Sequence, residues 1–166
     1  MLIHKYSNDD NSLTVEFSNE VLKFMLTECR LSKDLETGGI LVGYYNDDLN
    51  KAIILKSSRA PIDSKKTKNR FYRGVSGLKK WLSEMWYKER AYYIGEWHFH
   101  PFSSSEMSII DSTQMQSISR DNRINCPEPI LFIIGGNPQK KYSTSIYVFT
   151  KNIKPLKLNH YESEII

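Results

Sequence analysis

The amino-acid sequence predicts an α/β (α+β) fold, with a central mixed and largely antiparallel sheet that is flanked by helices. Short runs of β-branched and aromatic residues alternate along the chain with longer segments whose apolar residues repeat at helical spacing. No internal repeat and no linker rich in proline or glycine divides the 166 residues. We therefore expect one domain that spans residues 1–166.

The first half of the chain predicts three strands and a helix. Residues 12–17 alternate polar and apolar side chains, which is typical of a strand, and Ser18 is placed to cap a helix that runs to about Arg30. Residues 38–45 and 52–58 are β-branched and aromatic runs joined by a polar segment. These two runs predict a β-hairpin.

The second half begins with residues 60–70, which are polar and basic and indicate an exposed loop. Residues 74–90 predict a helix whose apolar face we expect in the core, and that face consists of Leu78, Trp81, Leu82, Met85 and Trp86. A strand over 91–100, a helix over 108–120 and strands over 130–135 and 144–150 are expected to follow. The tail from Asn152 has weak patterning, and we assign no element to it or to residues 1–11.

Charge and composition limit the classes of partner. The 23 Lys and Arg residues exceed the 19 Asp and Glu residues by only four, which is too little to favour nucleic acid, although residues 51–90 hold twelve basic and three acidic residues. The longest run without a charged residue has eleven residues, too few to cross a bilayer. Cys29 and Cys126 are expected to be reduced. We therefore expect a cytoplasmic protein with no nucleic-acid or membrane partner.

The segment from Gly95 to Asp111 contains the candidate metal ligands. Residues two apart in a strand project from the same face, so His98 and His100 place two imidazoles side by side. Ser108 is a candidate N-cap, and Asp111 lies three positions later, on the same side of the first helical turn. Asp111 can therefore be a third ligand. The alternative is a chance histidine pair followed by a helix start with an acidic first turn.

Two histidines and one carboxylate leave an open position on a tetrahedral zinc ion, which is typical of a catalytic site. The same ligands also suit non-haem iron. A general base is still required, and by residue type the candidates are Glu36, Glu96 and Glu106. Glu96 shares the strand face of the two histidines, so it is expected either to orient a ligand or to pair with a basic side chain.

The spacing His-x-His-x7-Ser-x2-Asp, formed by His98, His100, Ser108 and Asp111, resembles the signature of the JAB/JAMM (MPN-plus) family of metal-dependent isopeptidases and peptidases. Glu36, followed by small and apolar residues, is similar to the upstream catalytic glutamate of that family. The sequence around the two histidines is most similar to that of the short bacterial branch found in CBASS antiviral defence. The resemblance implies a single JAB/MPN-type domain over residues 1–166.

The resemblance also implies roles for these residues. His98, His100 and Asp111 would hold Zn²⁺, Glu36 would serve as general acid and base for the zinc-bound water, and Ser108 would hydrogen-bond the oxyanion. The implied substrate is a protein with an extended C-terminal tail, either a ubiquitin-like modifier or a nucleotidyltransferase conjugated to a target protein. An activating-enzyme homologue is the further implied partner.

Other functions stay open from the sequence alone. The same chemistry would serve a peptidase that matures a ubiquitin-like or sulfur-carrier protein precursor. A non-catalytic MPN scaffold is a further alternative, although such scaffolds usually lack the metal ligands that are all present here. The basic segment within residues 51–90 is interpreted as a solvated surface or as a docking face for a partner.

Overall fold

The computed structural model describes residues 2–151 and 154–165. Eight strands close into a barrel in the order β1-β10-β9-β8-β7-β3-β4-β2. Their bounds are Leu2–Ser7 (β1), Thr14–Ser18 (β2), Thr37–Tyr45 (β3), Lys51–Ser57 (β4), Tyr92–Pro101 (β7), Ile130–Asn137 (β8), Lys141–Val148 (β9) and Leu156–Ile165 (β10). The pairs β2–β4 and β7–β8 are parallel, and the other six pairs are antiparallel.

The predicted fold class, an α/β (α+β) fold with a central sheet flanked by helices, is wrong. The strands that change the architecture are β1 and β10, which come from segments to which the sequence pattern assigned no element. They pair with each other from Leu2↔Ile165 to Ser7↔Asn159, while β1 also pairs with β2 and β10 with β9. The terminal strands thereby close the sheet on itself. Asn152, where the unassigned tail begins, lies outside the described residues.

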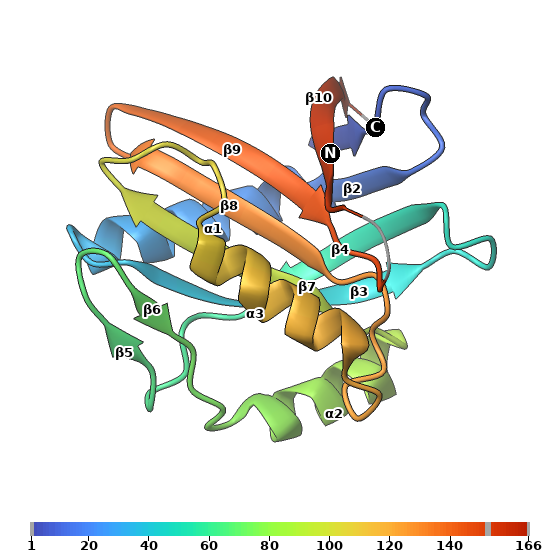
Figure 1. The fold of residues 1–166 in the computed structure, drawn as a ribbon, viewed down its shortest axis with the longest axis horizontal. Coiled ribbons are helices and arrows are strands. Elements are labelled where there is room, and N and C mark those ends of the chain that lie inside the picture. The colour runs from blue at the N-terminus through green and yellow to red at the C-terminus, as the bar shows by residue number, and fades with distance from the viewer. Residues whose placement is uncertain (1, 152–153, 166) are drawn as a thin grey trace.

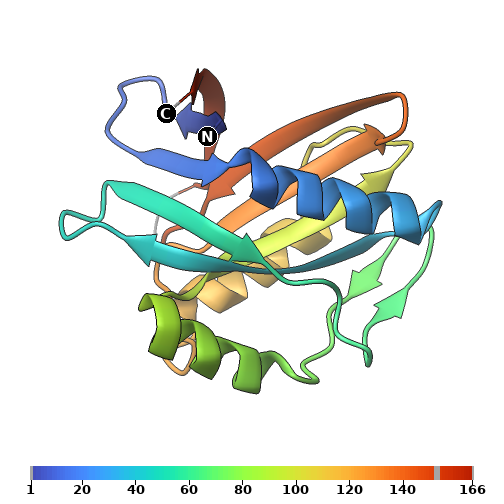
Figure 2. The same cartoon turned by 180° about the vertical axis from the view of Figure 1, so that it is seen from behind.

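Three helices pack against the barrel. They are α1 (Asn19–Ser32), α2 (Leu78–Glu89) and α3 (Ile109–Arg120). Helix α3 crosses the near face in Figure 1, and α1 crosses the face that is near the viewer in Figure 2, so the two lie on opposite sides. None of the described helices is long and apolar enough to cross a membrane.

The buried apolar side chains form three clusters. The main core joins Trp97, Phe99 and Phe132 of the barrel to one face of α1. Met115 and Ile118 of α3 pack on outward-facing residues of β8 and β9 in a second cluster. A third cluster places Met85 of α2 against β3. Strands β7 and β8 are therefore covered on both faces, which accounts for their continuous runs of buried residues.

Most internal elements agree with the sequence prediction. The predicted hairpin is confirmed by β3 and β4, and the helices predicted after Ser18, within 74–90 and after Ser108 are confirmed by α1, α2 and α3. Residues 60–70 are mostly exposed, but they also contain β5 (Lys65–Lys66), which forms a small separate hairpin with β6 (Phe71–Tyr72). The expectation of a core position is wrong for Trp86, which is 51% exposed.

Candidate metal centre

Strand β7 presents the two histidines on one face. Trp97 and Phe99 are buried in the main core, and His98 and His100 alternate with them and so face the other side of the sheet. Gly38 on the neighbouring strand allows this close packing, because a Cβ there would lie 2.2 Å from the Trp97 carbonyl oxygen and 3.1 Å from the His98 ring. The local strand geometry therefore delivers both imidazoles to one place.

Helix α3 delivers the carboxylate through its first turn. The backbone N–H of Asp111 donates to Ser108 Oγ (3.1 Å), and the backbone N–H of Ser108 donates to Asp111 Oδ2 (2.7 Å). This reciprocal capping box fixes the Asp111 side chain at the helix N-terminus, where the helix dipole favours a negative charge. Ser108 is confirmed as the N-cap of the helix.

The Asp111 carboxylate also contacts both imidazoles. His98 Nδ1 lies 2.8 Å from Asp111 Oδ1, and His100 Nε2 lies 3.3 Å from Asp111 Oδ2. All three residues are buried, and one ligand atom of each lies within 4.8 Å of the others. The two histidines and the aspartate that the sequence predicted as ligands therefore meet in one cluster that could hold a metal ion.

One buried atom tests whether this cluster suits a metal ion. His98 Nε2 has no hydrogen-bond partner among the described residues, and a buried polar atom without a partner is costly. Imidazole nitrogen and carboxylate oxygen are also common ligand types for zinc. The residues present therefore fit a metal ion.

The electrostatics of the cluster keep its aspartate ionised. Burial opposes ionisation of Asp111, but hydrogen bonds with His100, His98 and the Ser108 backbone hold the pKa of this carboxyl well below its usual range. Burial also opposes protonation of His100, yet its hydrogen bond with Asp111 and the attraction of Asp111 and Glu36 raise the pKa of that imidazole. Asp111 is therefore present as a carboxylate, the form that binds metals.

Glu36 faces the same cluster across a cavity of about 240 Å³. Burial raises the pKa of Glu36, while the neighbouring His100 charge lowers it and Asp111 raises it. No hydrogen bond or ion pair to the Glu36 carboxylate occurs among the described residues. The cavity brings together all the predicted site residues: Glu36, His98, His100, Ser108 and Asp111. A larger cavity of about 560 Å³ between α1, β4 and α2 contains none of them.

The two other glutamates considered as bases have partners. Glu106 lines the cavity, but its carboxylate accepts from Tyr147 Oη (2.7 Å) and from Lys157. Glu96 is fully buried and pairs with Arg73. Of the two roles expected for it, it therefore pairs with a basic side chain rather than orienting a metal ligand. Glu36 is therefore the glutamate best placed to exchange a proton with a ligand in the cavity.

The sequence pattern missed the contribution of the β5–β6 hairpin to the site. The Phe71 ring packs edge-on against the His98 ring, with centroids 5.7 Å apart, and the backbone N–H of Glu36 donates to the Thr67 carbonyl (2.8 Å). The aromatic pair Phe71 and Tyr72 at the end of the basic loop was the available signal. The hairpin thus forms one wall of the cavity.

Comparison with known proteins places this site in a family. The chain is 38% identical over 153 residues to the CD-NTase/cGAS isopeptidase of Enterobacter hormaechei subsp. hoffmannii, covering 92% of this chain and 84% of the relative. It is 32% identical over 129 residues to the probable metalloprotease y4qB of Sinorhizobium fredii, covering 72% of this chain and 74% of the relative. No protein-family model matches the chain.

A solved structure supports the fold alone. The solution structure of protein DSY2949 from Desulfitobacterium hafniense superposes with a TM-score of 0.60 at 16% identity, covering 88% of each chain. The two curated relatives, together with the His-x-His-x7-Ser-x2-Asp motif, define the class as metal-dependent peptidases and isopeptidases. The chain belongs to the JAB/JAMM (MPN-plus) family of isopeptidases and peptidases and is most like its short CBASS-associated bacterial branch.

Proposed function

We propose that the protein is a zinc-dependent isopeptidase that cleaves the amide bond between the C-terminus of a CD-NTase, or of a ubiquitin-like modifier, and a target protein. The observation that carries this proposal is the buried cluster of His98, His100 and Asp111, with the unpartnered His98 Nε2, beside Glu36 in one cavity. The name of the Enterobacter relative supports the choice of a CD-NTase conjugate as substrate.

The proposed mechanism assigns His98, His100 and Asp111 to hold zinc. The chemistry that such an ion supplies when bound is polarisation of the scissile carbonyl and a lowering of the pKa of water to about 7. The carboxylate of Glu36 takes the proton from the attacking water and delivers it to the leaving nitrogen, because an amine leaves readily only when it is protonated. Partial burial and the neighbouring charges suit Glu36 to both steps.

Ser108 is proposed to stabilise the oxyanion. Its Oγ accepts the backbone N–H of Asp111 at 3.1 Å, and no described residue accepts its hydroxyl hydrogen. That hydrogen can therefore be donated to the negative charge that develops on the carbonyl oxygen. A donor of this kind typically contributes on the order of 10²–10³ in rate.

The proposal is tested with a CD-NTase joined through its C-terminal carboxyl to a lysine of a reporter protein. The zinc-loaded chain should release the reporter. Glu36→Gln should reduce the rate by on the order of 10²–10⁴, because it removes the proton carrier, while zinc content and melting temperature stay unchanged. Equal rates for wild type and Glu36→Gln would refute the role of Glu36. Intact conjugate with the wild type would refute the proposed reaction.

A further inference from the structure

The β5–β6 hairpin is too small to be stable without contacts to the rest of the protein. Its strands pair only through Lys65↔Tyr72 and Lys66↔Phe71, and an isolated two-stranded hairpin is marginally stable at best in water. Its placement beside the site therefore depends on contacts with the barrel. Figure 1 shows the hairpin at one side of the molecule, beyond the N-terminal end of α3.

Two of these contacts reach the site residues directly. The hairpin turn accepts the backbone N–H of Glu36 through the Thr67 carbonyl (2.8 Å). The hairpin's second strand packs the Phe71 ring on the His98 ring. A movement of the hairpin would consequently move both the candidate general base and a candidate metal ligand.

The third contact is a buried ion pair. Arg73, the residue after β6, donates from Nε to Glu96 Oε2 at 2.8 Å and to Oε1 at 3.0 Å. Tyr93 Oη donates to the same carboxylate at 3.1 Å. The Glu96 side chain is 0% exposed and that of Arg73 is 18% exposed. Neither residue lines the site cavity, so neither is placed to touch substrate.

A β-bulge in strand β7 positions the Tyr93 and Glu96 side chains of this network on the barrel wall. Leu41 pairs with Gly95 but Val42 pairs with Tyr93, so strand β7 carries one extra residue at this point. The bulge places Tyr93 and Glu96, three residues apart, close enough to hydrogen-bond. Gly95 has φ +157°, and a Cβ there would lie 2.0 Å from the Ile130 carbonyl oxygen, so the position requires glycine.

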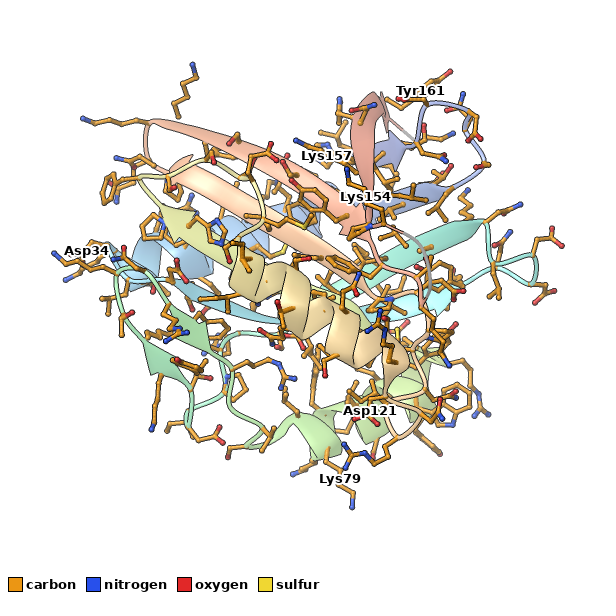
Figure 3. All side chains as sticks on the ribbon, in the orientation of Figure 1. Asp34, Lys79, Asp121, Lys154, Lys157 and Tyr161 are labelled. Carbon is orange, nitrogen blue, oxygen red and sulfur yellow. The ribbon has the colours of Figure 1, made fainter. Side chains whose placement is uncertain are left out.

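Burial makes the Arg73–Glu96 pair harder to separate than the exposed ion pair of the same hairpin. A buried charge is strongly destabilising unless a partner compensates it, and separating Arg73 from Glu96 would leave the fully buried Glu96 carboxylate unpaired. The ion pair from the hairpin turn to Asp34 differs, because the Lys68 and Asp34 side chains are 73% and 49% exposed and solvent screens them. Figure 3 shows Asp34 at the outer edge of the molecule.

We propose that Arg73 and Glu96 are positioning residues that hold the β5–β6 hairpin against Glu36 and His98 and thereby keep the general base and a metal ligand in working position. The inference rests on the proposed function for its effect on catalysis. Its effect on the hairpin is independent of any substrate.

The test compares wild type with Arg73→Met and with the double variant Arg73→Met/Glu96→Gln. The double variant leaves no unpaired buried charge, and its glutamine can still accept from Tyr93 Oη, so the barrel should stay folded. Amide hydrogen exchange at Glu36 should accelerate at least tenfold in both variants, with exchange in β8 and β9 unchanged. On the conjugate described above, kcat should fall at least tenfold while KM changes less than twofold.

The matched control is Lys79→Met, which also replaces a cation by methionine. Lys79 is on α2, points away from the barrel and forms no ion pair among the described residues (Figure 3). It should leave exchange and kcat as in wild type. Wild-type exchange at Glu36 in the double variant would overturn the inference, as would wild-type kcat. If the wild-type protein cleaves no conjugate, the proposed function fails, and the exchange at Glu36 alone decides whether the ion pair holds the hairpin.

Discussion

Asp111 is the residue at which the strand, the helix and the site meet. Its carboxylate accepts from the backbone of Ser108 and contacts the imidazoles of His98 and His100. These contacts outweigh the cost of burial and keep it ionised, as its lowered pKa indicates. A single aspartate therefore completes the capping box of a helix, contacts two histidines and offers a ligand oxygen.

The two cysteines, in contrast, are buried side chains whose thiols are expected to be unreactive. Both are free and buried. Burial, with a smaller contribution from Glu128, raises the pKa of Cys126 to about 12, and burial also raises the pKa of Cys29. A raised pKa disfavours the thiolate, which is the reactive form.

We therefore expect slow alkylation of the folded protein. At pH 8.5, where an unperturbed thiol is about half ionised, iodoacetamide should modify Cys126 on the order of 100-fold more slowly in the native protein than in guanidinium. Raising the pH from 7 to 9 should accelerate the reaction of the unfolded chain and leave the native rate low. Similar native and unfolded rates, measured by intact-mass spectrometry, would show that Cys126 is accessible and ionised.

Two elements, β7 and α3, supply the candidate ligands through purely local geometry. The alternation of a strand pairs His98 with His100, and the first turn of a capped helix pairs Ser108 with Asp111. Such relations are encoded in sequence spacing, which explains why these four residues could be predicted. The β5–β6 hairpin was missed because Phe71 and Arg73 act on His98 and Glu96, more than twenty residues away in sequence.

The start of α3 gives a prediction with two separable readouts. Ser108→Ala removes the N-cap acceptor and should lower the free energy of unfolding by about 1 kcal/mol. It also removes the proposed oxyanion donor and should lower the cleavage rate by on the order of 10²–10³. Ser108→Thr keeps the hydroxyl and should restore both properties, as measured by urea denaturation and by cleavage of the conjugate.

The outcome for Ser108→Ala separates the two roles. A loss of stability with an unchanged rate would leave Ser108 as a helix cap only. An unchanged free energy of unfolding would contradict the contribution of the capping hydrogen bond.

At the scale of the whole molecule, the chain termini decide the architecture. Strands β1 and β10 lie side by side in Figures 1 and 2 and close the barrel. Their pairing joins segments from opposite ends of the sequence. Polar and apolar residues alternate clearly only over residues 156–159 of β10, which is too short a pattern to predict a ten-residue strand. Local patterning therefore predicted the interior strands and helices but not the closure, and the predicted fold class failed for that reason.

Closure gives a stability prediction for the last strand. Leu158 on β10 is 2% exposed within the main core, so Leu158→Ala should lower the free energy of unfolding by about 2–5 kcal/mol. Leu156→Ala on the same strand is the control, because Leu156 is 37% exposed and its loss should cost less than about 1 kcal/mol. Equal losses for the two variants in urea denaturation would mean that β10 does not contribute to the core as described.

The zinc content of the purified protein tests the central claim most directly. After zinc loading and removal of free metal, inductively coupled plasma mass spectrometry should find about one zinc ion per wild-type chain. Asp111→Ala and His98→Ala should each retain far less, with circular dichroism confirming that they are folded. A wild-type chain that binds no zinc, or an Asp111→Ala variant that binds as much as the wild type, would contradict the assignment of this cluster as the metal centre.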